Sequence, residues 1–595
     1  MVSLAHDGLE IRRHRGGGVQ GGPDRLRLYG LAAGEALRAS RTRLGTLVRS
    51  PALLRSRIPE RLLLAPQDLR TADPTVAGDI YSGLFVFAGR ALTTGGRSPF
   101  QFTPPSAAWG EALYGFGWLR HLRAADTALA RANARALVGE FLAQRRDMPR
   151  LARRTPVAAR RLLAFLSQSP LLLEGADHAF YRRFMRSLGR TVRDLERAMR
   201  GAATPHERLL AATALCYAGL CCEGFDGLLR KATRHLVREL DRQILPDGGH
   251  VSRNPRVLVD LLLDLLPLRQ IYASRGLAVP KALTGAIDRV LPMLRLFRHG
   301  DGTLAHFNGM GVTAAHNLTT ILIYDEARAQ PMQHAPHSGY ERIQAATSLF
   351  MADVGSSPPI EHSREAHAGC LSFEFSSGAH RIVVNCGTSR VAQARAGLVS
   401  RATAAHSTAT VAETSSCRFM ATSGGVAERW VAPWLQRRLG AVILRGPETV
   451  RVERNGSEDG VTLTASHDGY RAAFGLVHER RWRLDADGQS LHGEDRLIPE
   501  GDKAGAHDVA VRFHLHPAVR VAEAEAGIRL TLPNEEVWLF EASPAPARLE
   551  ESVFFPTTDR PRRTAQIVLA FSTRNTTAVT WRLRRLLAAP SAEGA

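Results

Sequence analysis

Histidines recur in the strand-like second half of the sequence, where imidazoles from separate strands can converge on one site. His406 lies in an Ala-His-Ser-Thr segment, and His467 lies in a Ser-His-Asp-Gly-Tyr segment. Imidazole nitrogens are common zinc ligands, and a carboxylate often completes such a site. The residue types therefore predict a zinc ion held by His406 and His467, with hydrogen-bonded structural histidines as the alternative. His514 and His516, two residues apart on one strand face, form a second candidate pair.

A glycine-rich loop at residues 246–255 adds polar side chains between two helical segments. Its sequence is Pro-Asp-Gly-Gly-His-Val-Ser-Arg-Asn-Pro, and it contains His250, Arg253 and Asn254. A polar loop at a junction of helices can present its side chains to a cleft. The alternative is a plain turn without a functional role, in which Asp247 and Gly248 serve as capping residues.

A second loop of the same kind spans residues 297–311. His306 and Asn308 lie among several glycines there, which predicts a tight site with exposed backbone. A well-formed connection between two helices is again the alternative.

The loops described above must be positioned by helices, and the sequence shows a helical periodicity on both sides of them. From about residue 75 to 330, apolar residues recur at steps of three and four, the spacing of one helix face. Many helices joined by short loops, without a strict repeat motif, favour a toroid of helical hairpins over an array of identical units. The clearest helices are expected over residues 158–171, 180–199, 207–220, 228–244, 257–272 and 283–297.

Past about residue 345 the pattern changes to short alternating segments separated by turn residues, as in a β-sandwich. We therefore predict three parts: a basic N-terminal extension with an amphipathic helix (1–72), a helical toroid (73–330) and an antiparallel β-sandwich (345–590). The N-terminal helix is expected to pack on its own domain, with a membrane surface as the alternative. Strands are expected at residues 370–375, 381–386, 461–465, 481–484, 509–515, 528–532, 537–540 and 566–571.

Composition sets limits on the partners. The 595 residues are too many for one ordinary core, and they carry a formal net charge of +21. Arginine supplies nearly all of the basic side chains, and its guanidinium binds carboxylate or sulfate in a bidentate manner. An acidic polysaccharide is therefore a suitable partner. Nucleic acid is not expected, because the sequence contains no zinc finger, RNP motif or basic zipper.

Redox chemistry and targeting are also limited by the sequence. The six cysteines include no CxxC pair and are expected to be reduced and buried. No stretch approaches the roughly 20 apolar residues of a membrane-spanning helix. The first residues lack the basic and apolar regions of a secretory signal, which predicts a protein that stays inside the cell.

Taken in order, these segments resemble the heparinase II/III superfamily of polysaccharide lyases. The resemblance implies an incomplete (α/α) toroid followed by an antiparallel β-sandwich, in agreement with the periodicity. It also implies β-elimination at a uronate sugar: one group neutralises the carboxylate, a Tyr or His removes the neighbouring proton, and a Tyr or His protonates the leaving oxygen. The matching pieces are 81–89, 109–122, the Asp-Gly-Gly-His loop, Phe307-Asn308, 405–408 and 467–470.

The resemblance further implies roles for residues of the first loop and of the strands. His250 and Asn254 are expected to neutralise the carboxylate, with Arg253 as an additional positive charge. His406 resembles the histidine of the β-domain that faces the cleft or the zinc, and His467 resembles a zinc ligand. In the second loop, His306 and Asn308 are expected to bind substrate.

The catalytic tyrosine of the family is the main departure. No tyrosine lies between Tyr272 and Tyr324, so the motif assigns none. Tyr340, which we place in a loop, is the candidate for this role, and His306 or His316 is the candidate replacement.

The predicted function is that of a lyase acting on a uronate-containing polysaccharide, with zinc as a structural ion. A catalytically inactive protein that binds polyanionic glycans or belongs to the cell envelope is the alternative. A glycoside hydrolase using Asp247 and Asp301 is a third hypothesis. Lyases of this family generally work in the periplasm or outside the cell, so the missing secretory signal leaves localisation open.

Overall fold

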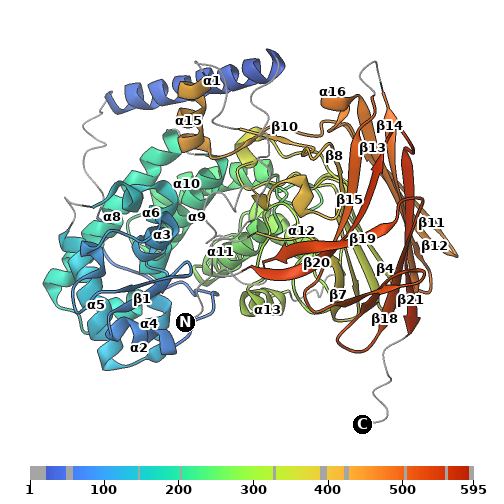
Figure 1. Ribbon diagram of the computed structural model, residues 1–595. Helices are drawn as coiled ribbons and strands as arrows, with labels where there is room; N and C mark the ends of the chain where they lie inside the picture. Colours follow the sequence, from blue (N-terminus) through green and yellow to red (C-terminus); the bar gives the residue numbers. More distant parts are fainter. Residues whose placement is uncertain are drawn as a thin grey trace, which may run out of the picture.

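The computed structural model describes residues 22–47, 58–144, 148–201, 204–325, 330–388, 399–420, 428–500, 505–555 and 561–587. Its first half is helical and its second half consists mainly of antiparallel strands, and the two parts lie side by side (Figure 1). This order confirms the predicted architecture of a helical toroid followed by a β-sandwich.

Five of the six predicted helices are present, with ends that differ by a few residues, and the segment predicted as one helix over 158–171 is divided between two helices, α6 and α7. Helix α9 (Pro205–Cys221) begins at a capping box, in which the Thr204 side chain accepts from the Glu207 backbone and the Glu207 side chain accepts from Thr204. It is buried on nearly every face because α6, α8, α10 and α11 surround it. The other helices before residue 330 are α2 (Thr75–Tyr81), α3 (Ala107–Gly115), α4 (Leu119–Ala125), α5 (Ala128–Ala143), α6 (Thr155–Ser167), α7 (Ser169–Leu173), α8 (His178–Arg200), α10 (Asp226–Gln243), α11 (Pro255–Ser274), α12 (Lys281–Leu296) and α13 (Ala315–Ile323). A short hairpin, β1 (Leu84–Phe87) with β2 (Arg90–Thr93), precedes α3.

Two antiparallel sheets form the second half. One has the order β11-β12-β13-β14-β21-β18-β17-β16, and the other has the order β19-β20-β15-β7-β6-β5-β4-β3, with β8 paired to β15. The strands of the first sheet are β11 (Val450–Ser457), β12 (Gly460–His467), β13 (Leu476–Asp485), β14 (Ser490–Pro499), β16 (Arg520–Ala524), β17 (Gly527–Thr531), β18 (Val537–Ser543) and β21 (Ala578–Leu587). Those of the second are β3 (His334–Ala335), β4 (Tyr340–Ala345), β5 (Ser348–Asp353), β6 (Phe373–Ser377), β7 (His380–Val384), β8 (Ala409–Val411), β15 (Asp508–Leu515), β19 (Ala547–Phe554) and β20 (Arg562–Ser572).

Aromatic side chains fill the space between the two sheets. Phe373 of β6 stacks on Trp581 of β21 at a centroid distance of 5.4 Å, and Phe350 of β5 meets Trp482 of β13 at 5.5 Å. All four side chains are buried. The alternating pattern of the sequence thus places one face of each strand in this shared core.

The sheet begins earlier than predicted. Strand β4 covers residues between the predicted toroid (73–330) and the predicted sandwich (345–590), and it pairs with β5 along its whole length. The strand was not predicted because two charged residues interrupt its apolar pattern. In the structure, Glu341 is buried in an ion pair with Arg454 at 2.7 Å, and Arg342 donates to the backbone carbonyls of Leu296 and Arg298. Tyr340 therefore lies in a strand and not in a loop.

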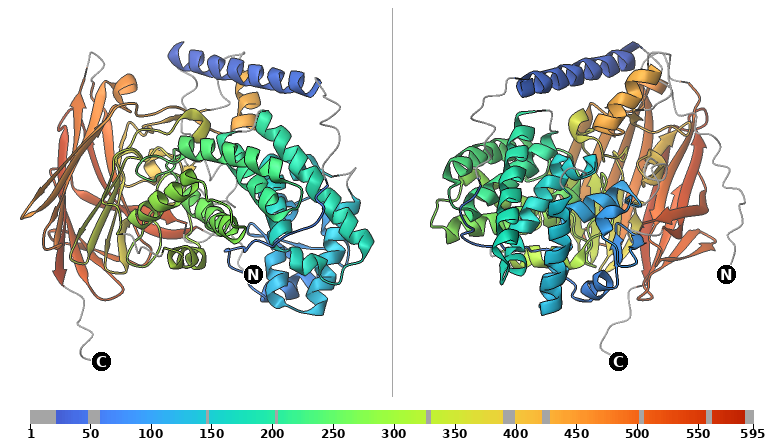
Figure 2. Two further views of the ribbon diagram at one scale, coloured as in Figure 1. Left: turned by 180° about the vertical axis from the view of Figure 1, so that it is seen from behind. Right: turned by 90° about the vertical axis from the view of Figure 1, so that its left-hand side faces the viewer.

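The N-terminal helix α1 (Gly22–Leu47) packs against α15 (Glu428–Leu439), far along the chain (Figure 2). Leu28 is fully buried in an apolar cluster with Leu435 and other side chains of that segment. Asp24 pairs with Arg418 at 2.9 Å, and buried Glu35 pairs with Arg438 of α15 at 3.1 Å. The N-terminal helix was expected to pack on its own domain, but its partner belongs to the second half of the chain. Strands β9 (Arg418–Phe419) and β10 (Ile443–Arg445) flank α15, and a short helix, α16 (Arg471–Phe474), follows β12.

Two simpler expectations can be compared with the structure. The six cysteines are buried and unpaired, as expected for reduced thiols. Among the described helices, none is both long and apolar enough to cross a membrane.

Candidate functional site

The first loop of the sequence analysis meets the β-domain through Arg253. Arg253 is 8% exposed, and its backbone is in the left-handed conformation, with a φ of 60°. It pairs with the buried carboxylate of Asp353, at the end of β5. The approach is so close that a Cβ on Gly355 would lie 2.3 Å from Nη2 of Arg253. The guanidinium also donates at 2.7–3.1 Å to the backbone carbonyls of Ser338, Gly339, Gly355 and Ser356.

Arg253 was predicted to supply positive charge to a substrate. In the structure its guanidinium is used internally, and it joins the helical loop to the sheet. Burial between the two domains and the Asp353 carboxylate explain this position, because a buried charge must be paired and hydrogen-bonded.

Tyr340 and Asn308 complete this network. The Tyr340 hydroxyl donates to the backbone carbonyl of Arg253 at 2.5 Å and accepts from Nδ2 of Asn308 at 2.9 Å. Asn308 also donates to Oδ2 of Asp353 at 2.7 Å. Burial raises the pKa of Tyr340 well above its ordinary value. Its proton is therefore bound tightly, whereas a general base needs a pKa near the working pH.

His250 and Asn254 are held within the loop itself. Nδ1 of His250 accepts from the Ser252 backbone at 3.1 Å, and Nε2 contacts Oε1 of Gln243 at 3.2 Å. Because the Gln243 amide nitrogen donates elsewhere, Nε2 of His250 is the donor in this contact. Burial lowers the pKa of His250 well below its ordinary value, so the imidazole is neutral.

Asn254 is the N-cap of α11. Its Oδ1 accepts from the Arg256 backbone at 3.0 Å, and its Nδ2 donates to the carboxylate of Glu365 at 3.3 Å. The Asn254 side chain is 3% exposed, whereas Glu365 is 55% exposed at its side chain. The Glu365 carboxylate also pairs with Arg256 at 3.7 Å, so the amide of Asn254 belongs to a polar cluster at the start of α11.

His406 lies on the β-domain side of the same interface, and it pairs with His367. Nδ1 of His406 contacts the carbonyl of Ala402 at 2.8 Å, so this nitrogen must carry the proton. Its Nε2 then accepts from Nδ1 of His367 at 2.9 Å, which leaves Nε2 of His367 as the basic atom of the pair. Burial lowers the pKa of His406 to about 4 and that of His367 well below its ordinary value.

Sequence analysis did not identify His367. The residue stands alone in an Ala-His-Ala-Gly segment, without a spacing that marks a site. Its backbone N–H donates to Oδ1 of Asn308 at 3.3 Å, which connects the histidine pair to the tyrosine network. Asp353, which ends an apolar strand, was missed for a similar reason.

His306 is buried beside this network. Its ring stacks on Phe554 at a centroid distance of 5.1 Å, and its Nδ1 has no hydrogen-bond partner among the described residues. Burial lowers the pKa of His306 to about 4, so the ring is neutral. The backbone N–H donates to Glu374, which also binds His299. The predicted role of His306 in substrate binding remains a prediction.

The described residues do not fit a zinc ion. His406 uses both ring nitrogens in the contacts given above. His467 accepts from the Gly469 backbone and lies next to His478, whose Nε2 is bound to Asp495 at 2.8 Å. In the parts of the chain that the structure describes, no three His, Cys, Asp or Glu side chains are grouped to hold a metal.

The second histidine pair is also occupied. Nε2 of His514 donates to the Ala404 carbonyl, and Nδ1 contacts Ser552. His516 contacts Arg381 at 3.2 Å. These contacts are those of structural histidines, which was the stated alternative.

Most of the predicted residues therefore meet at one place. Arg253, Asn308 and Tyr340 share a single network, and His406 is joined to it through His367. His250, Asn254 and His306 border it, and His467 lies apart on β12. The arrangement crosslinks two domains by hydrogen bonds, and its acid–base side chains face inward.

The fold and this interface define the class of the protein. The family model described as "Heparinase II/III-like, C-terminal" matches residues 327–582. A crystal structure of a heparan sulfate lyase HepC mutant from Pedobacter heparinus aligns with a TM-score of 0.60 at 14% identity, over 95% of this chain and 90% of that one. A structure of heparinase III aligns with a TM-score of 0.66 at 11% identity, over 91% and 89% of the two chains. At these identities the likeness concerns the fold.

A relative with higher sequence identity is named for its localisation and not for lyase activity. FtsZ-localized protein C of Caulobacter vibrioides is 32% identical over 537 residues, which cover 87% of this chain and 88% of that protein. The chain belongs to the heparinase II/III superfamily, and its similarity to this relative extends through both domains.

Proposed function

We propose that the protein is a member of the lyase superfamily that does not perform β-elimination and that localises with FtsZ. The similarity to FtsZ-localized protein C supports the second part, because it covers both domains at 32% identity. The first part depends on one observation: Tyr340, His250 and His406, which were predicted to act in elimination, are engaged in internal hydrogen bonds. An acidic polysaccharide is then a ligand and not a substrate.

The chemistry of elimination explains why this observation matters. A base must reach the proton next to the uronate carboxylate, and an acid must reach the leaving oxygen. The Tyr340 hydroxyl is bound to the Arg253 carbonyl in the core, and its pKa is raised. Asn254, which was predicted to neutralise the carboxylate, donates its amide to Glu365.

The test combines two measurements on the full chain. Near-ultraviolet absorbance during incubation with heparin, heparan sulfate, hyaluronan, chondroitin, alginate and polygalacturonate is expected to stay flat, because no unsaturated uronate forms. The protein is expected to sediment with FtsZ polymers assembled with GTP and to stay in the supernatant without them. An absorbance rise would contradict the first part, and absence from the FtsZ pellet would contradict the second.

Elimination of an acidic polysaccharide is the second candidate function, favoured by Nε2 of His367, which has no hydrogen-bond partner among the described residues. If absorbance rises, His367→Ala is expected to abolish the rise, because this atom is the basic site of the histidine pair. Tyr340→Phe is the matched control, since its hydroxyl lies in the core; it should retain the rise. The reverse result would make Tyr340 the base.

A further inference from the structure

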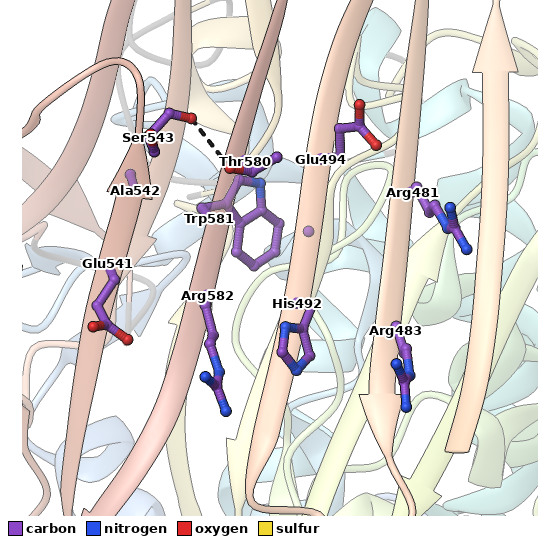
Figure 3. Close-up of a pocket in the computed structure, with 11 residues that line it drawn as sticks. Arg481, Arg483, His492, Glu494, Glu541, Ala542, Ser543, Thr580, Trp581 and Arg582 are labelled. Atoms are coloured by element: carbon purple, nitrogen blue, oxygen red, sulfur yellow. Dashed lines mark hydrogen bonds between the residues drawn. The ribbon is translucent and has the colours of Figure 1, made fainter. Parts of the chain in front are cut away.

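A shallow cavity of about 490 Å³ lies on the outer face of the eight-stranded sheet, away from the interface between the domains. Strands β13, β14, β21 and β18 form its floor, and Figure 3 shows the side chains that stand around it. The volume is within the range of small-molecule sites in proteins. We define it as the sheet trough, lined by Arg481, Arg483, His492, Gly493, Glu494, Glu541, Ala542, Ser543, Thr580, Trp581 and Arg582.

The register of the strands explains the shape of the trough. Side chains alternate between the two faces of a strand, so outward residues form rows that run across the sheet. One row contains Arg481, Glu494, Thr580 and Ser543, and the next contains Arg483, His492, Arg582 and Glu541. The row between them points into the core. The floor between the two outward rows is therefore backbone, and the trough runs across the strands.

Gly493 keeps the inward row flat. A Cβ at this position would lie 2.1 Å from the indole of Trp581, which is 3% exposed and bound through Nε1 to Asp495 at 3.0 Å. The indole thus packs directly under the β14 backbone. No side chain from this row can fill the trough.

The trough has an excess of unpaired positive charge. Its acidic side chains are already engaged: Glu494 pairs with Arg496 at 2.6 Å, and Glu541 pairs with Arg584 at 3.7 Å. Within the described part of the chain, no ion pair reaches Arg481 or Arg582.

Arg582 has N–H donors that are not used in hydrogen bonds to the described residues. Its Nη2 donates to the Ser490 hydroxyl at 2.9 Å, while its buried Nε has no hydrogen-bond partner among the described residues. Its Nη1 makes no hydrogen bond to a described residue, and a planar anion can pair with a guanidinium. Arg483 pairs with Asp485 at 3.4 Å and lies in the same row as Arg582, two strands away, about 10 Å.

We infer that the sheet trough binds an extended anionic glycan, with its carboxylate or sulfate groups on Arg481 and Arg582. Hydroxyl side chains beside these arginines, Thr580 and Ser543, can bind sugar hydroxyls. An acidic peptide fits less well for two reasons. The four strands are internal, so a peptide cannot add a strand to them, and the trough has no exposed aromatic or aliphatic anchor of the kind that dominates protein interfaces.

This inference rests on one part of the proposed function, the acidic polysaccharide as a ligand, and it names the surface that binds this ligand; the part that concerns FtsZ is independent of it. The experiment measures fluorescence anisotropy of two labelled probes, an oligogalacturonate that carries only carboxylates and a heparin oligosaccharide that also carries sulfates. The variant is Arg481→Ala with Arg582→Ala. Two charge-assisted contacts are removed, so the Kd of at least one probe is expected to rise by about tenfold or more. The probe that shows the rise identifies the anion.

The matched control is Arg520→Ala with Arg529→Ala, two arginines of the same sheet, on β16 and β17, that do not line the trough. It lowers the net charge equally and should change the Kd by less than about twofold, since long-range attraction is screened by salt. The inference is overturned if neither probe binds, if both double variants weaken binding equally, or if the trough variant binds normally. It is also overturned if a polyglutamate peptide, and neither glycan, depends on Arg481 and Arg582. Sedimentation with FtsZ is measured for the same variant. If the variant still sediments with FtsZ polymers, binding to FtsZ does not depend on the trough, and the two proposals are tested independently.

Discussion

Replacing Arg253 with alanine is expected to lower the stability of the protein by about 3–5 kcal/mol, the range measured when one partner of a buried ion pair is removed. The substitution leaves the Asp353 carboxylate buried without its cation, and four backbone carbonyls lose a donor. Differential scanning calorimetry of the full chain is the measurement. A change of this size corresponds to a fall of roughly 10 °C in the transition that involves the domain interface.

Two variants separate this explanation from a general effect of losing an arginine. Arg520→Ala removes an exposed ion pair with Glu535 and should cost less than about 1 kcal/mol. Asp353→Asn, combined with Arg253→Ala, removes the unpaired charge and should restore part of the lost stability. If Arg253→Ala alone melts at the wild-type temperature, the guanidinium does not hold the two domains together.

The helices could be predicted from sequence because their signals are local. Apolar residues at intervals of three and four positions identify the helical segments. Pro205 and Pro255, in the first turns of α9 and α11, identify where these two helices begin. The strand at Tyr340 could not be predicted, because Glu341 and Arg342 read as exposed. They are buried only through partners more than 40 residues away, Arg454 on one side and the Leu296 and Arg298 carbonyls on the other.

The structure brings most of the candidate residues together in one region, but their contacts could not be predicted from their spacing in the sequence. Asn308 was singled out by its loop, and it does lie at the centre of the network. Its partners, Asp353 and His367, come from single polar positions in apolar or small-residue segments. The sequence contains the residue types of acid–base chemistry, and only the fold shows that the hydrogen bonds of Tyr340 point inward. A family resemblance alone therefore does not assign the roles of these residues.

Acidification from pH 6.5 to pH 4.5 is expected to destabilise the protein steeply, because the interface contains neutral buried histidines. Burial lowers the pKa of His306 and His406 to about 4, and that of His514 to about 3. An unfolded histidine has a pKa near 6.5, so in this window the unfolded chain binds more protons than the folded one, and stability falls as pH falls. Each such group can contribute up to about 3 kcal/mol by the end of its titration. Glu374, whose pKa is lowered to about 2, loses its contribution only below this window.

His306→Leu gives the sharpest test of that explanation. It removes the titrating group and the Nδ1 atom that lacks a partner, and it keeps an apolar contact to Phe554. Melting temperatures measured between pH 7.5 and pH 4.5 are expected to fall less in this variant than in the wild type, with the difference growing as pH decreases. His337→Leu, at an exposed position, is the matched control and should follow the wild-type curve. Parallel curves for His306→Leu and the wild type would mean that the buried imidazole at 306 does not contribute to the acid sensitivity of the interface.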